Sequence, residues 1–557
     1  MKKNADQINF QVSPEVLETH GGKVDVAIDG QFPAKYFNKK VTLVATPVLK
    51  YADGETSFEP VTVQGEKVGD NNKVISYENG GNFTYKDAVD YTDAMRLSDL
   101  EMRITASKGS KSLDFDPIKI ADGVLATSSM VINYPKPILG VVREKNTTGI
   151  YDPYIDEFQR IVPDHFTADI HYLINSAEIR NTELSADDIR KLKEYTKSAF
   201  EAERKELKGI EISAYASPDG ALDLNTKLSE KRSGTSSGYM QKELKKEAIE
   251  AQLNTKFTPE DWEGFQEMMQ ESDIQDKELI LRVLSMYSDP EVREREIKNI
   301  SQAFTVVAED ILPRLRRAKI TTSVELIGKT DEEISQLAKS NPSALNPAEL
   351  LYAATLTTDQ NEKLKIYNAM QQVYSDDWRG YNNAGMVLLQ QGKAAEAKPL
   401  LEKAESLSNN EPIIKNNLGA VALSEGDVNA AETLFGAASG AGEEVDYNLG
   451  IVAIKKGEYD KAVQLLGNSD SPNAGLAKIL AGDNNGALKS LESCTWENCF
   501  MTEYFKAVVG ARTAKENLMY ESLEKAVEMN PELKSKIATD LEFAKYFEDA
   551  RFKEIIK

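Results

Sequence analysis

The sequence predicts a multidomain protein with an all-β first part, an α/β middle part and an all-α last part. Three patterns carry this prediction: apolar residues alternate with a period of two before about residue 134, a strand–helix–strand pattern follows residue 164, and a glycine and alanine triplet repeats near the end. A chain of 557 residues is also too long to pack around one core. We therefore expect at least three domains.

The first part carries the alternation expected of half-buried strands. Three such sets are Val24, Val26 and Ile28, then Val41, Leu43 and Ala45, then Met102, Ile104 and Ala106. Turn signals such as Gly21-Gly22 and Asp53-Gly54 separate the strands. Residues 21–134 are thus predicted to form an antiparallel sandwich, most simply an immunoglobulin-like one, with residues 1–20 as a tether or first strand.

A linker is expected between the first and middle parts. Pro135, Pro137, Pro153 and the run Asn146-Thr147-Thr148-Gly149 interrupt regular structure over residues 135–163. The next domain is expected over residues 164–328, where an alternating run ending near Ile174 is followed by a helical pattern and by a second strand at Ile210. We expect a helical insertion at about residues 241–309, in which Trp262, Phe265 and Met269 form the apolar face of a helix.

The segment Ile210-Glu-Ile-Ser-Ala-Tyr-Ala-Ser-Pro-Asp-Gly220, followed by Asn225-x-x-Leu-Ser-x-x-Arg232, resembles the central motif of the OmpA-like peptidoglycan-binding family. The resemblance implies an α/β fold and a site made by Ser217, Asn225 and Arg232. In that family an aspartate at the position of Ser217 pairs with the diaminopimelate amine, and Arg232 would pair with the peptide carboxylate, which suits a guanidinium. Because Ser217 brings no charge, two uses stay open: peptidoglycan binding, or a retained fold used for structure or for protein binding.

The last part repeats one spacing four times. The triplets are Gly385, Gly392 and Ala397; Gly419, Gly426 and Ala431; Gly450, Gly457 and Ala462; and Gly475, Gly482 and Ala487. The spacing of 34 residues from Gly385 to Gly419 resembles that of the tetratricopeptide family, with the small residues where two helices touch. We expect a solenoid with a terminal cap over residues 329–557, whose groove is long enough for an extended peptide or a partner helix.

Composition excludes several classes of function. A net charge of -23 opposes binding to nucleic acid or to an anionic lipid surface. The sequence offers no nucleophile, metal-ligand cluster or phosphate loop, so we expect no catalytic residues, no metal and no cofactor. Gly234-Thr-Ser-Ser-Gly238 fits a hydrolase pattern but falls on a predicted helix. Only Cys494 and Cys499 are present, and they are expected to form either a local disulfide or two free thiols.

The family resemblances together imply an envelope protein of Gram-negative bacteria, of a kind common in the Bacteroidota. We expect an outer-membrane lipoprotein that faces the periplasm or the cell surface, although the polar first residues leave open whether a signal peptide is absent or has been removed. The leading hypothesis is a non-enzymatic scaffold whose array recruits protein partners, such as those of an outer-membrane complex. The alternative is a peptidoglycan anchor.

Overall fold

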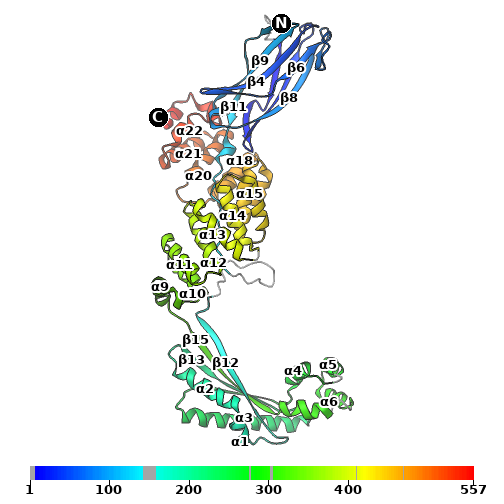
Figure 1. Cartoon of the computed structure of the whole chain (residues 1–557), viewed down its shortest axis with the longest axis vertical. Helices are drawn as coiled ribbons and strands as arrows, with labels where there is room; N and C mark the ends of the chain where they lie inside the picture. Colours follow the sequence, from blue (N-terminus) through cyan, green and yellow to red (C-terminus); the bar gives the residue numbers. More distant parts are fainter. Residues whose placement is uncertain (1–6, 142–157, 275–276, 301–304, 409, 468) are drawn as a thin grey trace. The chain divides into compact units, whose positions relative to one another are not determined.

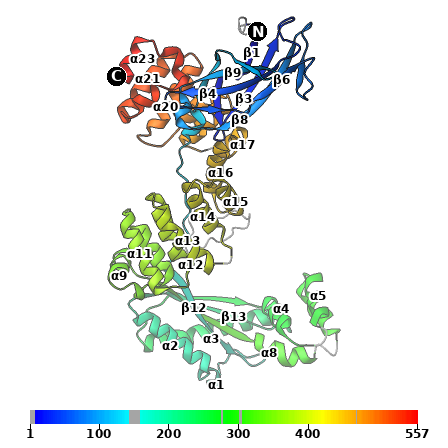
Figure 2. The same ribbon diagram turned by 45° about the horizontal axis from the view of Figure 1, so that its top comes forward.

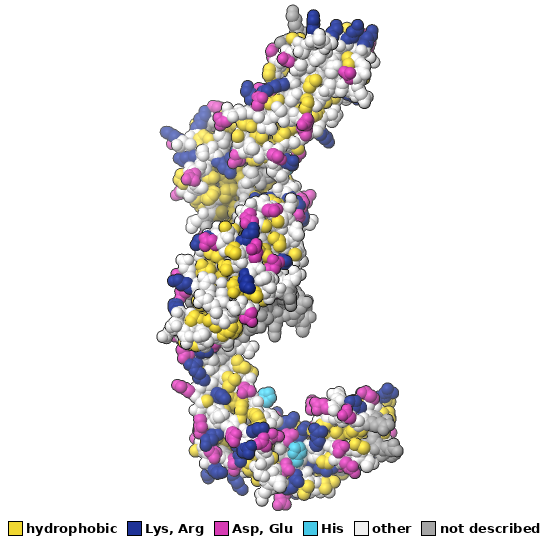
Figure 3. Space-filling view, viewed as in Figure 1, with side chains coloured by type: hydrophobic (Ala, Val, Ile, Leu, Met, Phe, Trp, Pro, Cys, Tyr) yellow, Lys and Arg dark blue, Asp and Glu magenta, His cyan; other side chains and the backbone are white. Residues whose placement is uncertain are grey.

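A computed structural model describes residues 7–141, 158–274, 277–300, 305–408, 410–467 and 469–557. The chain forms two compact units, one from residues 1–156 together with 337–557 and the other from residues 157–336. The first unit joins a β domain to a helical array, and the second is an α/β domain. On the face shown in Figure 3, acidic and basic side chains are interspersed.

The β domain is built from two strand systems that share one strand. The first contains β1 (Asn9–Ser13), β3 (Lys23–Phe32) and β8 (Gly81–Asp90), paired antiparallel. The second has the order β11 (Ile118–Leu125), β9 (Ser98–Lys108), β4 (Thr42–Tyr51), β6 (Val61–Gly65) and β7 (Lys73–Ile75), with β5 (Gly54–Ser57) on β4 and β10 (Lys111–Asp114) on β9. The shared strand β2 (Val16–His20) pairs with both β3 and β11.

The predicted alternation is confirmed in this domain. Val24, Ile28 and Leu43 are at most 1% exposed and belong to one apolar core. The prediction of a wholly antiparallel module is wrong, because β2 pairs parallel with β11 and β6 pairs parallel with β7. Residues 9–13 and 16–20 are strands, so this stretch belongs to the sheet rather than to a tether. The immunoglobulin-like assignment stays a prediction.

The second unit contains a four-stranded sheet with the order β12 (Ile161–His171), β15 (Arg317–Ile327), β13 (Lys205–Tyr215) and β14 (Leu253–Thr258). β15 is antiparallel to β12 and β13, and β14 is parallel to β13. Parallel strands need a crossover connection, and α3 (Leu222–Lys246) supplies it between β13 and β14. Figure 1 shows α3 and α2 (Asp187–Glu201) along one face of the sheet, where their apolar residues share its core.

The predicted helical insertion is only partly helical. α3 continues to Lys246 and β14 follows, so the helical part begins at α4 (Trp262–Glu271) and continues through α5 (Lys277–Met286) and α6 (Pro290–Lys298). Its own apolar core includes Phe265 and Met269, at 1% and 0% exposed, as expected for a packing face. β14 was not predicted because all its residues except Leu253 are exposed, and Phe257 is the only apolar one among those exposed residues.

The helical array is a series of antiparallel helix pairs (Figure 1). The pairs are α10 (Pro347–Ala353) with α11 (Gln360–Val373), α12 (Trp378–Gln390) with α13 (Ala394–Leu407), α14 (Pro412–Ser424) with α15 (Val428–Ala437), α16 (Glu443–Lys455) with α17 (Tyr459–Leu466), α18 (Pro472–Leu480) with α19 (Asn484–Glu492), and α20 (Phe500–Arg512) with α21 (Glu516–Met529). The chain ends with α22 (Leu533–Ile537), η7 (Leu541–Tyr546) and α23 (Ala550–Ile556).

Each member of the repeated triplet has its own structural task. A Cβ on Gly385 or Gly419 would lie 2.7 Å from Leu401 or Phe435 of the paired helix, so only glycine permits this approach. The second glycine of each triplet lies in the turn between the two helices with φ between +74° and +87°, a conformation that side chains disfavour. The four alanines, such as Ala397, are 0% exposed. The predicted helical-hairpin array is thus confirmed.

Candidate functional site: a peptide groove and its occupant

The groove of the array already contains a polypeptide, which is part of the same chain. After β11 and a short helix, η3 (Thr127–Met130), residues 131–141 have no regular secondary structure and lie along the array beside α18, α16, α14 and α12 (Figure 2). We call residues 131–141 the groove segment. Its second half, residues 135–141, falls in the stretch predicted to be a linker, and residues 142–157 of that stretch lie outside the described residues.

Four asparagines hold the groove segment, one from the first helix of each of four successive pairs. We call Asn383, Asn417, Asn448 and Asn473 the asparagine ladder. Each accepts a hydrogen bond from a backbone N–H and donates one to the backbone C=O of the same residue. For Asn417 and Ile138 the two bonds are 2.7 and 2.8 Å long, and for Asn448 and Lys136 they are 2.7 and 2.9 Å.

The two ends of the ladder repeat this geometry. Asn383 bonds to both backbone groups of Gly140, at 2.6 and 3.1 Å, and Asn473 bonds to both of Ile132, at 2.9 and 2.9 Å. The segment therefore runs from the later repeats toward the earlier ones. A side-chain amide suits this task because it carries both a donor and an acceptor, as a backbone peptide does.

A second row of asparagines joins neighbouring members of the ladder. Asn382 accepts a bond of 2.9 Å from Asn417, and Asn416 accepts one of 2.9 Å from Asn448. Asn382 and Asn416 also donate to the carbonyls of Ile138 and Lys136, at 3.3 and 3.1 Å. All six asparagines are 0% exposed. Because an unpaired buried amide costs free energy, this network needs the segment, or a substitute, to satisfy it.

The composition of the groove segment fits the ladder. Pro135 and Pro137 have no N–H to offer, and they occupy positions beside Lys136 and Ile138, whose N–H groups are the bonded ones. A proline also disfavours helical backbone in the residue before it, which favours an extended conformation at Tyr134 and Lys136. The prolines that indicated a linker therefore prepare the segment for the groove.

Side-chain contacts add to the backbone bonds, and one of them is a 3.2 Å hydrogen bond from the Asn133 side chain to the Leu423 carbonyl. Ile138 is 2% exposed and belongs to the core of the array. The Lys136 ammonium lies 4.6 Å from the ring centre of Tyr447, and Tyr134 packs edge-on against Trp496 with ring centres 6.2 Å apart. Burial raises the pKa of Tyr447 to about 12, so its hydroxyl stays neutral at physiological pH.

The asparagine ladder was not predicted, although the sequence contains a signal for it. An asparagine stands two residues before the first glycine of every triplet, as in Asn383-Ala384-Gly385 and Asn417-Leu418-Gly419. The glycines indicate where two helices touch. The asparagines have no such explanation, because asparagine is a poor helix former and adds no apolar surface to a helix contact. A buried amide that recurs with the repeat indicates a repeated hydrogen-bonding partner.

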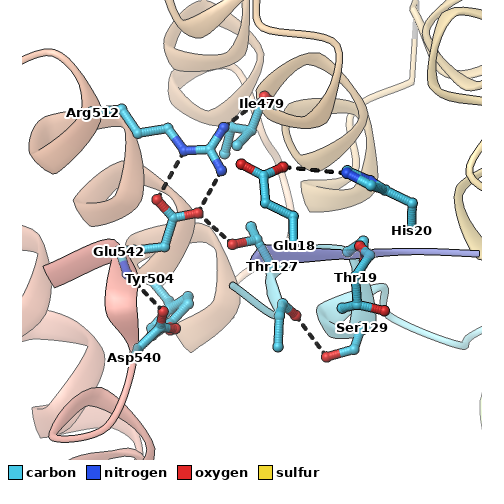
Figure 4. A network of polar contacts seen from close by, with 12 residues as sticks. Glu18, Thr19, His20, Thr127, Ser129, Ile479, Tyr504, Arg512, Asp540 and Glu542 are labelled. Carbon is cyan, nitrogen blue, oxygen red and sulfur yellow. Dashed lines mark hydrogen bonds and ion pairs between the residues drawn. The ribbon is translucent and has the colours of Figure 1, made fainter. Parts of the chain in front are cut away.

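A polar contact region also joins the β domain to the array (Figure 4). Arg512 of α20 binds Glu542 through two bonds of 2.9 and 2.5 Å, and Glu542, whose side chain is 3% exposed, also accepts from Thr127 just before the groove segment. His20 of β2 lies 2.8 Å from the Tyr459 hydroxyl and 3.3 Å from Glu18. The hydrogen bond with His20 lowers the pKa of Glu18.

The predicted OmpA-like site has a different character. Arg232 of α3 is 1% exposed, and its guanidinium donates to the carbonyls of Ser176, Tyr215 and Leu173 at 3.0, 2.8 and 3.3 Å. Burial lowers its pKa to about 10, which still leaves it charged at neutral pH. Arg232 thus connects the loop after β12 with the end of β13.

Ser217 and Asn225 are likewise engaged within the domain. Ser217 is 5% exposed, and its hydroxyl accepts a 3.2 Å bond from Arg316, which also pairs with Asp219 at 3.2 Å. Asn225 donates to the carbonyls of Ser217 and Gly220, both at 3.1 Å. The structure brings the three predicted residues together around one loop, and in it their polar atoms bind protein groups. Whether they also bind peptidoglycan stays a prediction.

Two polar residues of β12 bind protein groups: His171 lies 3.6 Å from Glu183, and Asp169 pairs with Arg317 at 3.2 Å. Of the two states expected for Cys494 and Cys499, the structure has two free thiols. Gly234 and Gly238 lie within α3, which is not the strand-to-helix turn a hydrolase needs. Within the described ranges, no group of three or more His, Cys, Asp or Glu side chains is placed to hold a metal. No helix in the described part of the chain is long and apolar enough to cross a membrane.

Comparison with known proteins yields structural neighbours only. No protein-family model matches the chain, and no curated protein matches it. Similar solved structures include the C-terminal part of a TPR repeat-containing protein from Cytophaga hutchinsonii, at 15% identity over 41% of this chain and 92% of that one, with a TM-score of 0.26. YrrB, described as a TPR protein with an unusual peptide-binding site, matches at 18% identity over 36% of this chain and 94% of its own, with a TM-score of 0.21.

A third neighbour is the APC/C hetero-tetramer Cut9-Hcn1, at 12% identity over 61% of this chain and 66% of that one, with a TM-score of 0.30. The first two of these neighbours are described as TPR proteins. Because their TM-scores are low, the function of this chain is inferred from its own internal contacts.

Proposed function

We propose that this protein is a non-enzymatic scaffold of the cell envelope, in which the array binds extended polypeptide and holds the β domain through it. The observation that carries the proposal is the asparagine ladder, in which four buried amides bind both backbone groups of four residues. No reactive group is needed for this function. The structural consequence of the binding is that the groove segment, which follows the β domain in the chain, fixes that domain to the array.

The envelope location rests on the resemblance of residues 164–328 to the OmpA-like family. On that basis we propose an outer-membrane lipoprotein that faces the periplasm or the cell surface, with protein partners in the envelope. Mass spectrometry of the native protein is the direct test. A native N-terminus without an acyl group would contradict the lipid anchor.

The peptidoglycan alternative is tested by co-sedimentation with isolated sacculi. The bonds of Arg232, Ser217 and Asn225 to protein groups favour a structural use of this loop, and we expect the native chain to stay in the supernatant. A Ser217→Asp variant restores the acid that the family has there. Pelleting of the native chain with sacculi would favour the anchor over the scaffold.

Hydrogen exchange with residue resolution tests the binding of the groove segment. The amides of Lys136, Ile138 and Gly140 are expected to be protected because each donates to a buried asparagine. The amide of Leu139, for which the described part of the chain provides no hydrogen bond, serves as the internal control and should exchange faster. Equal, unprotected exchange at all four would overturn the proposal.

A further inference from the structure

We infer that the groove also binds, in place of its own segment, an extended basic segment of a partner protein with the pattern x-Pro-(Lys/Arg)-Pro-aliphatic-x-Gly. This inference rests on the proposed function, since it requires that the array binds the groove segment in the first place. It goes further by naming the chemistry of a ligand that comes from another protein.

The hydrogen bonds of the ladder do not depend on the side chains of the residues that they bind. The ladder contacts only N–H and C=O groups of its four residues, and Asn133 and Tyr134 of the segment are partly or largely exposed. Any extended chain can make these bonds if residues with an N–H stand at the positions of Ile132, Lys136, Ile138 and Gly140. Prolines fit the positions between them and reduce the entropy lost on binding.

Two positions select for side-chain size. The side chain of Ile138 is buried in the array, so an aliphatic residue is favoured there. At Gly140 a Cβ would lie 2.7 Å from Trp378 Cζ3 and 2.9 Å from Asn383 Oδ1. The position therefore admits glycine, and a larger residue would have to displace either the Trp378 ring or the ladder.

The charge of the partner follows from a cavity beside Lys136. This cavity has a volume of about 540 Å³ and is lined by Lys136 and Tyr447 together with residues of α16, α17 and the loop after α17. Its acidic members are Glu443, Glu444, Asp446 and Asp470. Four carboxylates and one lysine line this cavity, so a partner with an arginine at the position of Lys136 would add donors and bind more tightly.

The chain's own segment acts as a competitor. A segment joined to the array by the chain has an effective concentration in the millimolar range, so a partner peptide must overcome it. Weakening the native segment without changing the ladder should therefore expose the binding of an added peptide. Gly140→Val does this through the contact with Trp378, and Ile138→Ala does it by removing buried apolar surface.

The experiment measures fluorescence anisotropy of a labelled peptide with the sequence of residues 130–141, added to the full chain. We expect at least tenfold tighter binding to the Gly140→Val chain than to the native chain, and an intermediate affinity for Ile138→Ala. Adding Asn417→Ala and Asn448→Ala to the Gly140→Val chain should weaken binding at least tenfold. In the peptide, Lys136→Arg should tighten binding and Lys136→Glu should weaken it.

A peptide with prolines moved to positions 136 and 138 is the matched control, because it has the same composition but lacks the two central N–H groups. Equal binding of this control would overturn the inference, as would failure of the native peptide to bind either variant when circular dichroism shows both to be folded. If the Gly140→Val chain instead forms concentration-dependent dimers that block the peptide, the occupant of the groove is a second copy of this chain, and the inference of a partner protein is overturned. If hydrogen exchange finds the amides of Lys136, Ile138 and Gly140 unprotected in the native chain, the proposed function itself is contradicted.

Discussion

The groove of the array and the loop around Arg232 both use buried polar side chains to bind backbone, and they do so in opposite ways. The asparagines of the ladder offer a donor and an acceptor each and so bind both groups of a passing chain. Arg232 offers donors alone and directs them to three carbonyls of its own domain. The first arrangement binds a segment that another chain could replace, whereas the second fixes loops and is complete without a ligand.

The largest effect is expected from Arg232→Ala. The change leaves three carbonyls without their charged donor and opens a cavity, so the α/β domain should lose about 4 kcal/mol of unfolding free energy. Urea denaturation measures the loss, and hydrogen exchange near Leu173 and Tyr215 locates it. Lys231→Ala, at the exposed neighbour, should change the stability by less than about 0.5 kcal/mol. A small effect of Arg232→Ala would mean that the guanidinium is free for a ligand.

Asn417→Ala is expected to have the next largest effect. It removes two bonds to Ile138, one to Asn382 and one from Asn416, at a cost of about 2 kcal/mol. The groove segment should loosen while the helices persist. Loss of amide protection at Ile138 with an unchanged far-ultraviolet circular dichroism spectrum checks this. Asn429→Ala, at an exposed asparagine of the array, is the control. Unfolding of the whole array would contradict a replaceable segment.

Gly140→Ala tests how closely the segment approaches the array. A Cβ would contact Trp378 and Asn383, so we expect a loss of about 1 to 2 kcal/mol and a change in tryptophan fluorescence. Gly69→Ala, where a Cβ meets nothing within 4 Å, should have no such effect. If both variants behave alike, the segment lies farther from Trp378 than the structure shows.

The smallest effect is expected from a change of pH. It should alter the stability of the polar contact between β2 and the array and leave the asparagine ladder unchanged. The folded pKa of Glu18 is lowered from 4.5 by its hydrogen bond with His20. The ionised Glu18 therefore contributes fully to the free energy of unfolding above about pH 4.5, and this contribution is lost as the pH falls through the lower folded pKa. The change is less than about 1 kcal/mol because the pair is partly exposed. The amides of the ladder do not titrate. Protection factors at Ile138 should stay constant over this range, and Glu18→Gln should remove the dependence found near β2.

The sequence predicted the architecture well where a residue pattern repeats along the chain. It predicted poorly the features that depend on a single long-range contact. The triplets identified the helix pairs, and the alternation around Val24 and Leu43 identified strands. β14 was missed because its mostly polar, exposed residues do not carry the pattern of a buried strand, and it is fixed by pairing with β13. Arg232 was identified as a binding residue from the motif, but two of the three carbonyls that it binds, those of Leu173 and Ser176, lie outside the motif.

The sequence by itself determined the order of the domains and the spacing of the repeat, because helix and strand periods and the fit of glycine between helices are local properties. Tertiary structure alone decided that Pro135 and Pro137 belong to a bound segment instead of a free linker. The bonds concerned join Lys136 to Asn448 and Ile138 to Asn417, which are 312 and 279 residues apart. No local pattern specifies a pairing over that distance, which depends on where the stacked helices place each buried amide.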